Sequence, residues 1–515
     1  VSHQESRMLA RTWSAALVGI DAVKVGVEVD IAGGLPGIVV VGLPDMAVQE
    51  SRERVKAALK NAGYAFPMRK IVINLSPADL RKEGPSFDLP ISMGILAASE
   101  QVNPQLLDSH LFLGEVSLDG SLRPVTGVLA IAAAAQKLGL PGIVVPEANV
   151  REAAVVKGLK VYGFNHLAHV ADFLNNPANY SPVELDGETE LARSPYTGLD
   201  LKDVKGQAQA RRALEIAAAG GHNVIFVGPP GSGKTMLARR LPSILPPLSF
   251  EEALEVTQIH SVAGMLREKG ALVNERPFRS PHHSASGPSL VGGGSFPKPG
   301  EISLAHRGVL FLDELTEFKR DVLEFLRQPL EDGSVTISRT RQSVSFPAQF
   351  TLVASTNPCP CGYFGDTIQP CTCTPRQRES YWAKLSGPLM DRIDLQVAVN
   401  RLKPEEITRQ FSGEGSAPIR ERVQIASDRI QARFKHDSPR SNAEMQSRHL
   451  RQWCALDETS TQLLEGAIRK LGLSARATDR ILKVSRTIAD LAEDDTIQSH
   501  HVAEAVQYRT IDRMQ

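Results

Sequence analysis

The first third of the chain mixes two hydrophobic periods. Residues 23–31 read Val-Lys-Val-Gly-Val-Glu-Val-Asp-Ile, with an apolar side chain at every second position, which predicts a half-buried strand. Two further apolar runs, at residues 37–41 and 70–75, predict two more strands. Three longer stretches predict helices, the second and third of them rich in alanine: residues 47–62, 89–100 and 128–138. These elements predict a first domain over residues 1–175.

The rest of the chain divides where its composition changes. Residues 176–200 are polar and contain proline, so they predict a linker. Residues 201–400 alternate apolar runs with helical stretches and predict an α/β core, whereas residues 401–515 predict a helical part with a loop at residues 412–418. A chain of 515 residues needs more than one domain, because single cores rarely grow beyond about 250–300 residues.

One apolar run of the middle part, at residues 223–227, ends in Gly-Pro-Pro-Gly-Ser-Gly-Lys-Thr, and a helical stretch follows at residues 236–241. A glycine-rich turn between a buried strand and a helix lets backbone N–H groups surround a polyphosphate. In this pattern Lys234 reaches the β- and γ-phosphates of ATP, and the Thr235 hydroxyl binds Mg²⁺. The predicted ATP-binding residues are Gly228, Pro229, Pro230, Gly231, Ser232, Gly233, Lys234 and Thr235. The alternative is a plain Gly/Pro-rich turn.

A second motif, at residues 309–314, argues against that alternative. Its sequence Val-Leu-Phe-Leu-Asp-Glu predicts a buried parallel strand with two carboxylates at its carboxyl end, the edge where α/β proteins bind ligands. Asp313 suits Mg²⁺ binding, and Glu314 suits polarising the attacking water in phosphoryl transfer. The alternative for two acids after a strand is a solvated helix N-terminus. Beside Lys234, ATP hydrolysis is the better interpretation.

Composition restricts the partners and the compartment. The formal net charge is +0, so contacts with nucleic acid must come from local patches. No apolar run approaches the ~18 residues that span a bilayer. The first residues carry no apolar signal core, and five cysteines do not make a disulfide scaffold, so we expect a cytoplasmic protein without a membrane partner.

Two further segments of the middle part bear on catalysis. A strand expected at residues 349–354 ends in Ser-Thr-Asn-Pro, where Asn357 could orient the lytic water. Arg392 lies in Gly-Pro-Leu-Met-Asp-Arg-Ile-Asp, and on a loop it could reach the γ-phosphate in a neighbouring subunit, which is worth roughly 10³–10⁵ in rate. The alternative for Arg392 is an ion pair with Asp391 or Asp394.

These motifs, in this order, resemble the AAA+ ATPases of the magnesium-chelatase and MCM clade. The segment between the first two contains Phe-Arg-Ser-Pro-His-His-Ser-Ala-Ser at residues 278–286 and Gly-Gly-Gly-Ser-Phe-Pro-Lys-Pro-Gly at residues 292–300. With residues 41–55 and 74–84, these stretches are similar to the ComM/YifB family, and the resemblance covers nearly the whole chain. It implies an AAA+ P-loop NTPase core with a helical C-terminal lid, preceded by an α+β domain of the Lon-protease (ribosomal S5 domain 2-like) type.

The resemblance also assigns roles to single residues. It implies that Lys234 and Thr235 bind phosphate and Mg²⁺, that Asp313 holds Mg²⁺ and that Glu314 is the catalytic base. The other implied catalytic residues are Asn357 as first sensor, Arg392 as arginine finger, and Arg476 as second sensor, with Arg480 as a substitute for Arg476.

The N-terminal part resembles the proteolytic domain of Lon through residues 82–88 and 113–124. That enzyme uses a Ser–Lys dyad, in which the lysine activates the serine. Ser86 occupies the nucleophile position, but Leu129 stands where the lysine is expected, and the nearest lysine is Lys137. An apolar side chain cannot deprotonate a serine, so we expect no peptidase activity.

Four cysteines follow the first sensor as two Cys-x-Cys pairs: Cys359, Cys361, Cys371 and Cys373. Four thiolates within residues 359–373 can close a tetrahedral structural Zn²⁺ site. The alternatives are four reduced thiols or a disulfide, and a reducing cytosol disfavours the disulfide. Cys454 is expected to be packed in a helix.

In residues 332–346 apolar and polar side chains alternate on both sides of a polar tip. This pattern predicts a β-hairpin with Arg339 and Arg341 at its tip. In a ring such hairpins would line the pore and bind DNA phosphates, and Lys298 and the pair His282-His283 belong to a second insertion that could face the pore. These contacts would depend on salt rather than on sequence. A solvated hairpin tip, and a metal site at the histidine pair, are the alternatives.

The resemblance implies an ATP-driven homo-hexameric DNA motor, a branch-migration helicase that acts on recombination intermediates in natural transformation. Its implied ligands are ATP, Mg²⁺, structural Zn²⁺ and branched, single-stranded or double-stranded DNA, with recombination proteins as possible partners. Two rivals stay open: the motor subunit of a magnesium chelatase, and a non-enzymatic assembly factor for which ATP serves only assembly.

Overall fold

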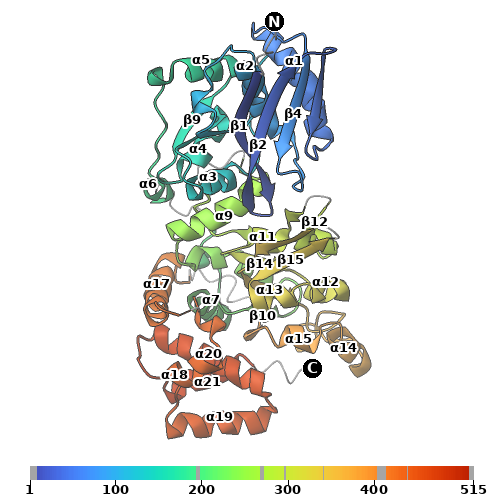
Figure 1. Ribbon diagram of the computed structural model, residues 1–515. Coiled ribbons are helices and arrows are strands. Elements are labelled where there is room, and N and C mark those ends of the chain that lie inside the picture. The colour runs from blue at the N-terminus through green and yellow to red at the C-terminus, as the bar shows by residue number, and fades with distance from the viewer. Residues whose placement is uncertain are drawn as a thin grey trace, which may run out of the picture. The chain divides into compact units, whose positions relative to one another are not determined.

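The computed structural model describes residues 8–192, 198–266, 272–294, 297–339, 342–402, 413–437 and 439–509 (Figure 1). The chain forms two compact units. The N-terminal unit combines Val1–Ser194 with Phe250–Asn274, and the second unit combines Pro195–Ser249 with Glu275–Gln515.

The N-terminal unit is built on a seven-stranded mixed sheet in the order β3-β4-β2-β1-β5-β8-β9. β1 and β2 form a long antiparallel hairpin that pairs Met8 with Ile31 and Val18 with Asp21. This arrangement confirms the three strands predicted before residue 76. The strands of the sheet are β1 (Met8–Val18), β2 (Asp21–Ala32), β3 (Gly37–Val41), β4 (Lys70–Ser76), β5 (His110–Phe112), β8 (Gly142–Pro146) and β9 (Lys160–Phe164), and a small separate pair is β6 (Glu115–Val116) and β7 (Leu122–Arg123).

The helices of this unit confirm the three predicted ones to within a few residues. α2 is buried along its whole length and packs on β1 and β2. The polar segment 176–200 contains a short helix and a bridge between Val161 and Val183. The helices are α1 (Met46–Asn61), α2 (Asp88–Ala98), α3 (Val128–Lys137), α4 (Val150–Ala154), α5 (Leu167–Asn175), α6 (Gly187–Ala192) and α9 (Phe250–Val262), with 3-10 turns at Pro85–Phe87, Pro104–Leu106, Glu147–Asn149 and Pro177–Asn179.

α9 packs with the N-terminal unit, although the chain reaches it only after the glycine-rich loop. It lies against α3, and Ser261 donates a hydrogen bond to the buried Glu152. The same carboxylate accepts the Leu129 N–H at 3.0 Å. A contact of this kind between distant segments leaves no trace in the local sequence pattern.

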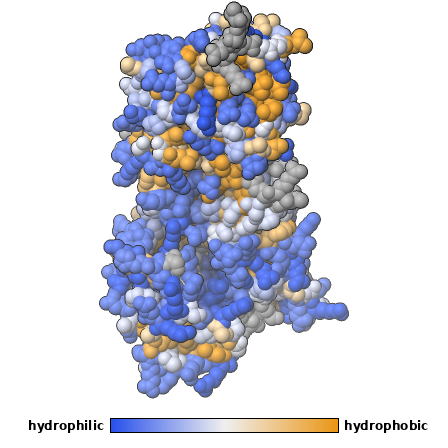
Figure 2. Space-filling model, viewed as in Figure 1, coloured by the Kyte–Doolittle hydropathy of each residue, from blue (hydrophilic) through white to orange (hydrophobic). Residues whose placement is uncertain are grey.

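Exposed apolar side chains are concentrated on the N-terminal unit. Among the described residues, every large apolar side chain that is more than half exposed belongs to it, except Ile368. In the space-filling view the surface is mostly polar, and orange apolar patches lie over the strands of this unit (Figure 2). The most exposed of these side chains are Leu9, Leu35, Met46 and Met68.

The second unit contains a five-stranded sheet in the order β11-β14-β17-β10-β18, in which every pair is parallel. This confirms the buried parallel strand predicted at residues 309–312. The strands are β10 (Val224–Val227), β11 (Phe278–Arg279), β14 (Val309–Leu312), β17 (Thr351–Thr356) and β18 (Leu395–Ala398), with two separate hairpins, β12 (Gly292–Gly293) with β13 (Lys298–Pro299) and β15 (Ser334–Arg339) with β16 (Gln342–Pro347).

Helices cover this sheet and continue into the C-terminal part of the unit. Those around the sheet are α7 (Ala208–Gly220), α8 (Lys234–Ala238), α10 (Gly287–Val291), α11 (Glu301–Leu304), α12 (Arg320–Glu324), α13 (Arg327–Asp332), α14 (Pro375–Trp382) and α15 (Gly387–Met390), with 3-10 turns at Leu201–Asp203, Leu241–Ile244 and Leu315–Glu317. The C-terminal helices are α17 (Ser416–Arg433), α18 (Ser447–Trp453), α19 (Glu458–Leu471), α20 (Ala475–Leu491) and α21 (Ser499–Gln507), with a 3-10 turn at Asn442–Glu444.

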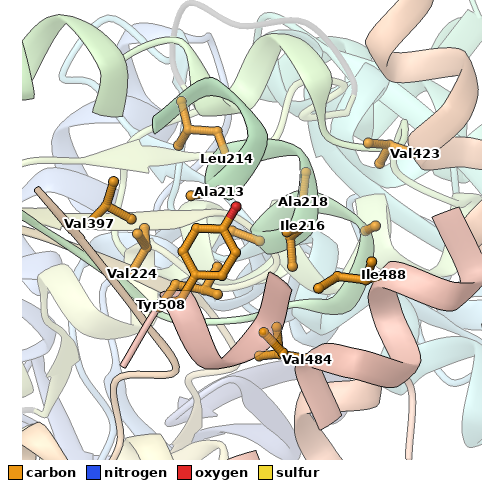
Figure 3. Close-up of a cluster of buried hydrophobic side chains, with 14 of the residues drawn as sticks. Ala213, Leu214, Ile216, Ala218, Val224, Val397, Val423, Val484, Ile488 and Tyr508 are labelled. Carbon is orange, nitrogen blue, oxygen red and sulfur yellow. The ribbon is translucent and has the colours of Figure 1, made fainter. Parts of the chain in front are cut away.

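One hydrophobic core joins the sheet to the C-terminal helices. Side chains of α7, β10 and β18 pack with those of α17 and α20 around the buried Tyr508 (Figure 3). The C-terminal helices are therefore fixed to the sheet, and side chains on them can be located relative to the glycine-rich loop.

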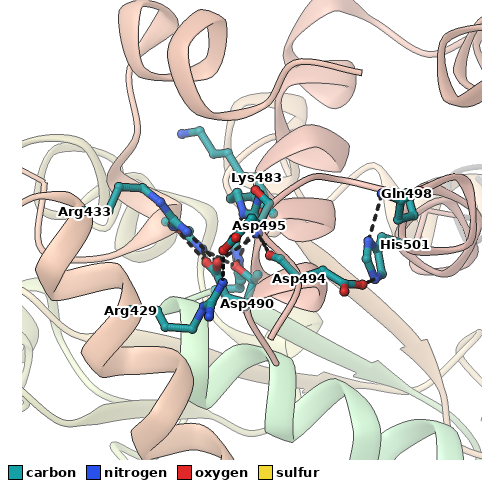
Figure 4. Close-up of polar contacts among 12 residues, drawn as sticks. Arg429, Arg433, Lys483, Asp490, Asp494, Asp495, Gln498 and His501 are labelled. Carbon is teal, nitrogen blue, oxygen red and sulfur yellow. Dashed lines mark hydrogen bonds and ion pairs between the residues drawn. The ribbon is translucent and has the colours of Figure 1, made fainter. Parts of the chain in front are cut away.

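Buried charges tie the C-terminal helices to one another (Figure 4). Asp490 is fully buried and accepts hydrogen bonds from Arg433 at 2.8 Å and from Arg486 at 3.2 Å, so its charge is paired. Nearby, His501 accepts the Gln498 N–H on Nδ1 at 3.0 Å and directs Nε2 at Asp494, 3.3 Å away. Since Nδ1 is an acceptor, Nε2 carries the proton, and this ring serves as a helix cap rather than as a metal ligand.

Candidate nucleotide-binding site

The glycine-rich loop, residues 228–235, connects β10 to α8, which confirms the predicted strand–loop–helix order. At Gly228 a Cβ atom would come within 2.0 Å of the Val399 carbonyl oxygen, so only glycine fits. Gly231 and Gly233 have φ of +76° and +95°, in the left-handed region that favours glycine. The loop can therefore turn its backbone N–H groups toward a bound anion.

Lys234 is 9% exposed and folds back over this loop. Its Nζ donates to the carbonyl oxygens of Gly228 at 2.7 Å and Pro229 at 3.0 Å, and to Oδ1 of Asn357 at 3.2 Å. Burial lowers the pKa of Lys234 to about 8, against the opposing charges of Asp313 and Glu314. The predicted phosphate ligand and the predicted first sensor are thus in direct contact.

The predicted Mg²⁺ ligands also meet. Thr235 donates to Oδ2 of Asp313 at 2.8 Å, and the hydroxyl of Ser355 donates to Oδ1 of the same carboxylate. Both side chains and the carboxylate lie at the carboxyl edge of the sheet, with the hydroxyl and carboxylate oxygens that Mg²⁺ prefers. Ser355 was not among the predicted residues, although it stands in the Ser-Thr-Asn-Pro segment that pointed to Asn357.

Glu314 follows β14 with φ of +52°, an uncommon value for a residue with a side chain. Its side chain is 55% exposed, and Oε2 lies 3.6 Å from Nδ1 of His283. His283 lies against His282 with ring centroids 4.0 Å apart and the rings tilted by 35°, and it meets Phe318 edge-on. The histidine pair predicted to face a pore is therefore placed beside the predicted catalytic base.

Arg392 lies at the opposite edge of the sheet. The backbone N–H groups of Asp394 and Leu395 donate to the Asn223 carbonyl at 3.0 Å, and the Asn223 side chain donates to the Arg392 carbonyl at 2.9 Å. Asn223 precedes β10, whereas the glycine-rich loop follows it. In one chain Arg392 is therefore separated from Lys234 by the length of a strand.

Arg392 is 8% exposed and forms an ion pair with Glu331, not with Asp391 or Asp394. Its Nη1 also donates to the Pro388 carbonyl at 2.5 Å, and its Nε–H is buried without a hydrogen-bond partner among the described residues. Burial, together with the nearby guanidinium groups of Arg327 and Arg480, lowers the pKa of Arg392 below its ordinary value.

The two arginines of α20 lie at the same edge. Arg476 is exposed and pairs with Asp391 at 3.4 Å, next to Arg392 in the chain. Arg480 pairs with Asp394, whose other oxygen contacts Nδ1 of His222 at 3.1 Å. Burial alone would raise the pKa of Asp394, but Arg480 and His222 hold it well below its usual range. Arg392, Arg476 and Arg480 thus form an arginine cluster at the amino edge.

The four sequence-predicted cysteine ligands come together. Their Sγ atoms all lie within 4.8 Å of one another, at 3.3 Å for Cys359 and Cys361, 3.7 Å for Cys359 and Cys371, and 3.6 Å for Cys361 and Cys371. A tetrahedron with metal–sulfur bonds of about 2.3 Å has edges of about 3.8 Å, so the cluster fits a zinc ion. These separations exclude the S–S bond of about 2.05 Å that the disulfide alternative requires.

Backbone N–H groups donate hydrogen bonds to sulfur atoms of this cluster. Phe364 donates to Sγ of Cys359 at 3.3 Å, and Cys361 donates to Sγ of Cys373 at 3.3 Å. Cys454 lies apart from the cluster and is buried, as expected for a packed thiol.

The predicted DNA contacts are only partly described. β15 and β16 form the predicted antiparallel hairpin, with Arg339 as the last residue of β15. The side chain of Arg339 and the whole of Arg341 lie outside the described residues. Lys298 is exposed and pairs with Gly293 in the second small hairpin.

In the N-terminal unit Ser86 stands in a 3-10 turn, and Leu129 is buried in the first turn of α3. Lys137 is exposed in the last turn of the same helix. Lys82 is buried and donates to the Pro77 carbonyl. Absence of peptidase activity stays a prediction.

Across the residues that the structure describes, none of the helices has both the length and the apolar character that crossing a membrane requires. The parallel sheet, its glycine-rich loop and the carboxylates after β14 define the class of the second unit as an α/β domain like that of AAA+ magnesium chelatases.

Family models agree with this class. Residues 200–407 match the model described as magnesium chelatase, subunit ChlI; residues 27–149 match subunit ChlI of Mg-chelatase; and residues 413–509 match the ChlI C-terminal model. The chain is 46% identical to the uncharacterized protein YifB of Escherichia coli (strain K12) over 508 residues, 98% of each chain. It is 45% identical to the competence protein ComM of Haemophilus influenzae over 510 residues, again 98% of each. The chain belongs to the ComM/YifB family.

A more distant relative is the magnesium-chelatase 38 kDa subunit of Cereibacter sphaeroides. It is 26% identical over 171 residues, which cover 30% of this chain and 51% of the relative.

Proposed function

We propose that this protein is an ATP-dependent DNA motor of the ComM type, a cytoplasmic homo-hexameric helicase that drives branch migration of recombination intermediates in natural transformation. The observation that carries the proposal is the separation of Lys234 from Arg392 by the sheet. One chain holds a phosphate cradle at one edge and buried or paired arginines at the other. A ring of copies would bring the arginine cluster of one subunit to the cradle of the next.

ATP binding in this proposal uses the contacts at the carboxyl edge. The triphosphate lies along the N–H groups of residues 228–235. It replaces the loop carbonyls as the hydrogen-bond partner of Lys234 Nζ, and its negative charge favours the charged form of that amine. Thr235 and Asp313 would hold Mg²⁺, which neutralises charge on the β- and γ-phosphates when bound.

Hydrolysis requires a positioned water and a positive group that stabilises the negative charge of the transition state. Glu314 accepts a proton or hydrogen bond from the water, and Asn357 orients it. Arg392 of the adjacent subunit, assisted by Arg476, stabilises charge on the γ-phosphate, a contribution of roughly 10³–10⁵ in rate in comparable enzymes. To reach it, Arg392 must leave Glu331.

DNA in the pore would be contacted by the β15–β16 hairpin through Arg339 and Arg341, and by Lys298. The competence name of the Haemophilus influenzae relative supports DNA as the substrate. Because such contacts are made to phosphates, the affinity should fall steeply with salt.

The four cysteines bind one structural Zn²⁺ ion in this proposal, supported by the spacing of their sulfur atoms. Metal analysis of the full-length protein, purified without chelator, should find about one zinc per chain, since one Cys₄ cluster binds one ion. Absence of zinc after reconstitution with ZnCl₂ would retire this part.

A second candidate is the motor subunit of a magnesium chelatase. The specific observation in its favour is that family models described by that subunit match three segments, including residues 27–149 of the N-terminal unit. A non-enzymatic assembly factor is a third candidate, and the contacts of Lys234 with Asn357 and of Thr235 with Asp313 argue against it.

One experiment separates the three: ATP turnover measured without DNA, with duplex DNA and with a four-way junction, alongside gel analysis of junction movement. Stimulation by the junction together with strand exchange supports the motor. Turnover indifferent to DNA favours the chelatase subunit, and ATP binding without turnover favours the assembly factor.

A further inference from the structure

The cysteine loop, defined here as residues 358–374, packs on the phosphate-binding loop. Gly362 has φ of +87°, and a Cβ atom there would lie 2.8 Å from Cδ of Pro230. Cys359 is fully buried, and it follows Asn357, which accepts the Lys234 hydrogen bond. The first cysteine pair therefore stands between the first sensor and a contact with the phosphate-binding loop.

The second cysteine pair leads into α14. Thr374 caps this helix through its contacts with Gln377. At the next-to-last residue of the helix, the Tyr381 hydroxyl accepts a hydrogen bond from Thr316 at 2.6 Å and lies 3.4 Å from Thr356. Thr316 closely follows Glu314, and Thr356 directly precedes Asn357. α14 thus contacts threonine side chains that lie close in the chain to both residues expected to position the lytic water.

The two ends of the cysteine loop are also connected to each other. Trp382 of α14 donates its Nε1–H to the Pro358 carbonyl at 3.1 Å. Arg378 stacks over Phe364 at 4.2 Å and donates to the Cys373 carbonyl at 3.3 Å. A metal bound by the four sulfur atoms would close this arrangement into one rigid unit, because it joins the Asn357 side to the α14 side.

We infer that metal occupancy of the cysteine cluster positions Asn357 and the tip of the phosphate-binding loop, so that ATP hydrolysis depends on the bound metal. This inference rests on the proposed zinc binding and the proposed ATPase activity. It assigns to the cluster a positioning role for catalysis in addition to the local folding that a structural zinc ordinarily supports.

The expected signature is a loss of turnover larger than the loss of ATP affinity. Without the metal the cysteine loop is held by hydrogen bonds, by Arg378 and Arg401 stacked over its aromatic rings, and by the Arg401–Asp366 ion pair. Among the described residues, only hydrogen bonds that involve sulfur then join the two cysteine pairs directly, so Asn357 is held less firmly. A shift of about 1 Å in a catalytic group can lower the rate about a hundredfold, and we expect a fall in kcat of about ten- to a hundredfold. KM for ATP should rise less, because Lys234 and Thr235 remain in place.

The experiment uses the full-length protein and two kinds of change. Cys371→Ser removes a metal ligand. Gly362→Val keeps all four ligands but inserts a side chain against Pro230. Gly365→Val is the matched control, since Gly365 has φ of +80° and nothing within 4 Å of its Cβ position. Zinc content, melting temperature, kcat and KM, and the affinity for a fluorescent ATP analogue are measured for each.

The inference predicts that Cys371→Ser lacks zinc and that Gly362→Val retains it, while both lose kcat about tenfold or more relative to Gly365→Val. If the wild type binds zinc but both variants keep kcat within about twofold, the positioning role is overturned and the zinc site stands. If reconstituted wild type binds no zinc, the metal proposal and this inference fail together.

A separate measurement distinguishes failure of the proposed ATPase activity from failure of this inference. If the wild type binds the ATP analogue but hydrolyses no ATP, the affinity for the analogue becomes the deciding measurement. A loss of about fivefold in both variants, relative to Gly365→Val, supports the positioning of the phosphate-binding loop by the cluster, and unchanged affinity overturns it. Cys454→Ser, a buried thiol outside the cluster, controls for the loss of a cysteine as such.

Discussion

The two edges of the sheet in the second unit hold their charges in different ways. At the carboxyl edge the polar groups gather at the glycine-rich loop: Lys234 donates to Asn357 and to two loop carbonyls, and Thr235 donates to Asp313. At the amino edge the arginine cluster is held by ion pairs. Each arginine is neutralised by an acid of its own, and Glu331 and Asp391 are accessible to solvent.

This difference shows what each edge can do. Side chains that are already gathered at one edge need only a local change, the release of Lys234 from its carbonyl partners, to bind a triphosphate and its cation. Arg392 is buried, but its partner Glu331 is 60% exposed and can turn into solvent, so exchanging that partner for a phosphate should cost on the order of 1 kcal/mol. The carboxyl edge suits binding, and the amino edge suits delivery of charge to another molecule.

The largest effect on ATP turnover is expected from removal of the Arg392 guanidinium. We expect Arg392→Ala to lower ATP turnover by roughly 10³–10⁵ while the affinity for ATP changes little, since Arg392 lies away from the cradle of its own chain. Steady-state kinetics and equilibrium binding of a fluorescent ATP analogue check this. Arg469→Ala, at an exposed arginine of α19, is the control and should be neutral.

The buried ion pair at the amino edge should contribute mainly to stability. Asp394→Asn leaves Arg480 without its buried partner, and breaking such a pair costs about 3–5 kcal/mol in the free energy of unfolding. The pKa of Asp394 is held below its unfolded value, so its contribution is present at neutral pH and is lost as pH falls below about 4.

Urea unfolding of wild type and Asp394→Asn across this pH range measures that difference. Asp495→Asn is the control, because Asp495 is exposed and pairs with Arg429. Equal stability of Asp394→Asn and wild type at pH 7 would show that the amino edge does not depend on this pair.

The smallest effect is expected from a change to Glu331, the partner of Arg392 at the amino edge. Glu331→Gln removes the carboxylate that competes for Arg392, so the protein concentration giving half-maximal ATPase activity should fall about two- to fivefold, the equivalent of about 0.5–1 kcal/mol. A titration of ATPase activity against protein concentration checks this, with Glu465→Gln, which pairs with the exposed Arg469, as the control. An unchanged midpoint would argue that the Arg392–Glu331 pair is not broken in the active state.

The elements of both units could largely be predicted from hydrophobic period. The alternation at residues 23–31 is the centre of β2, and the apolar runs before the glycine-rich loop and before Asp313 are β10 and β14. The association of α9 with the N-terminal unit could not be predicted, because it depends on packing against α3 and on contacts such as that between Ser261 and Glu152. No local pattern reports a partner so distant in the chain.

In the candidate site, too, some contacts could be predicted from the sequence and others could not. Lys234, Thr235 and Asp313 stand in motifs whose spacing fixes their place at strand ends, so sequence alone brought them together. Glu331 and His283 meet Arg392 and Glu314 only through the packing of separate segments. Asp391 and Asp394 were the expected partners of Arg392 because they are near it in the chain. In the structure Asp391 pairs with Arg476, and Asp394 pairs with Arg480.

The most direct test of the account is complementation between two inactive variants, Arg392→Ala and Lys234→Ala, mixed under assembly conditions. If the site is completed by an adjacent copy, an intact Lys234 from one variant meets an intact Arg392 from the other, and about a quarter of random interfaces should regain turnover. Mixtures that stay as inactive as either variant alone, or an Arg392→Ala protein with unchanged turnover, would contradict the claim that the arginine acts across a subunit boundary.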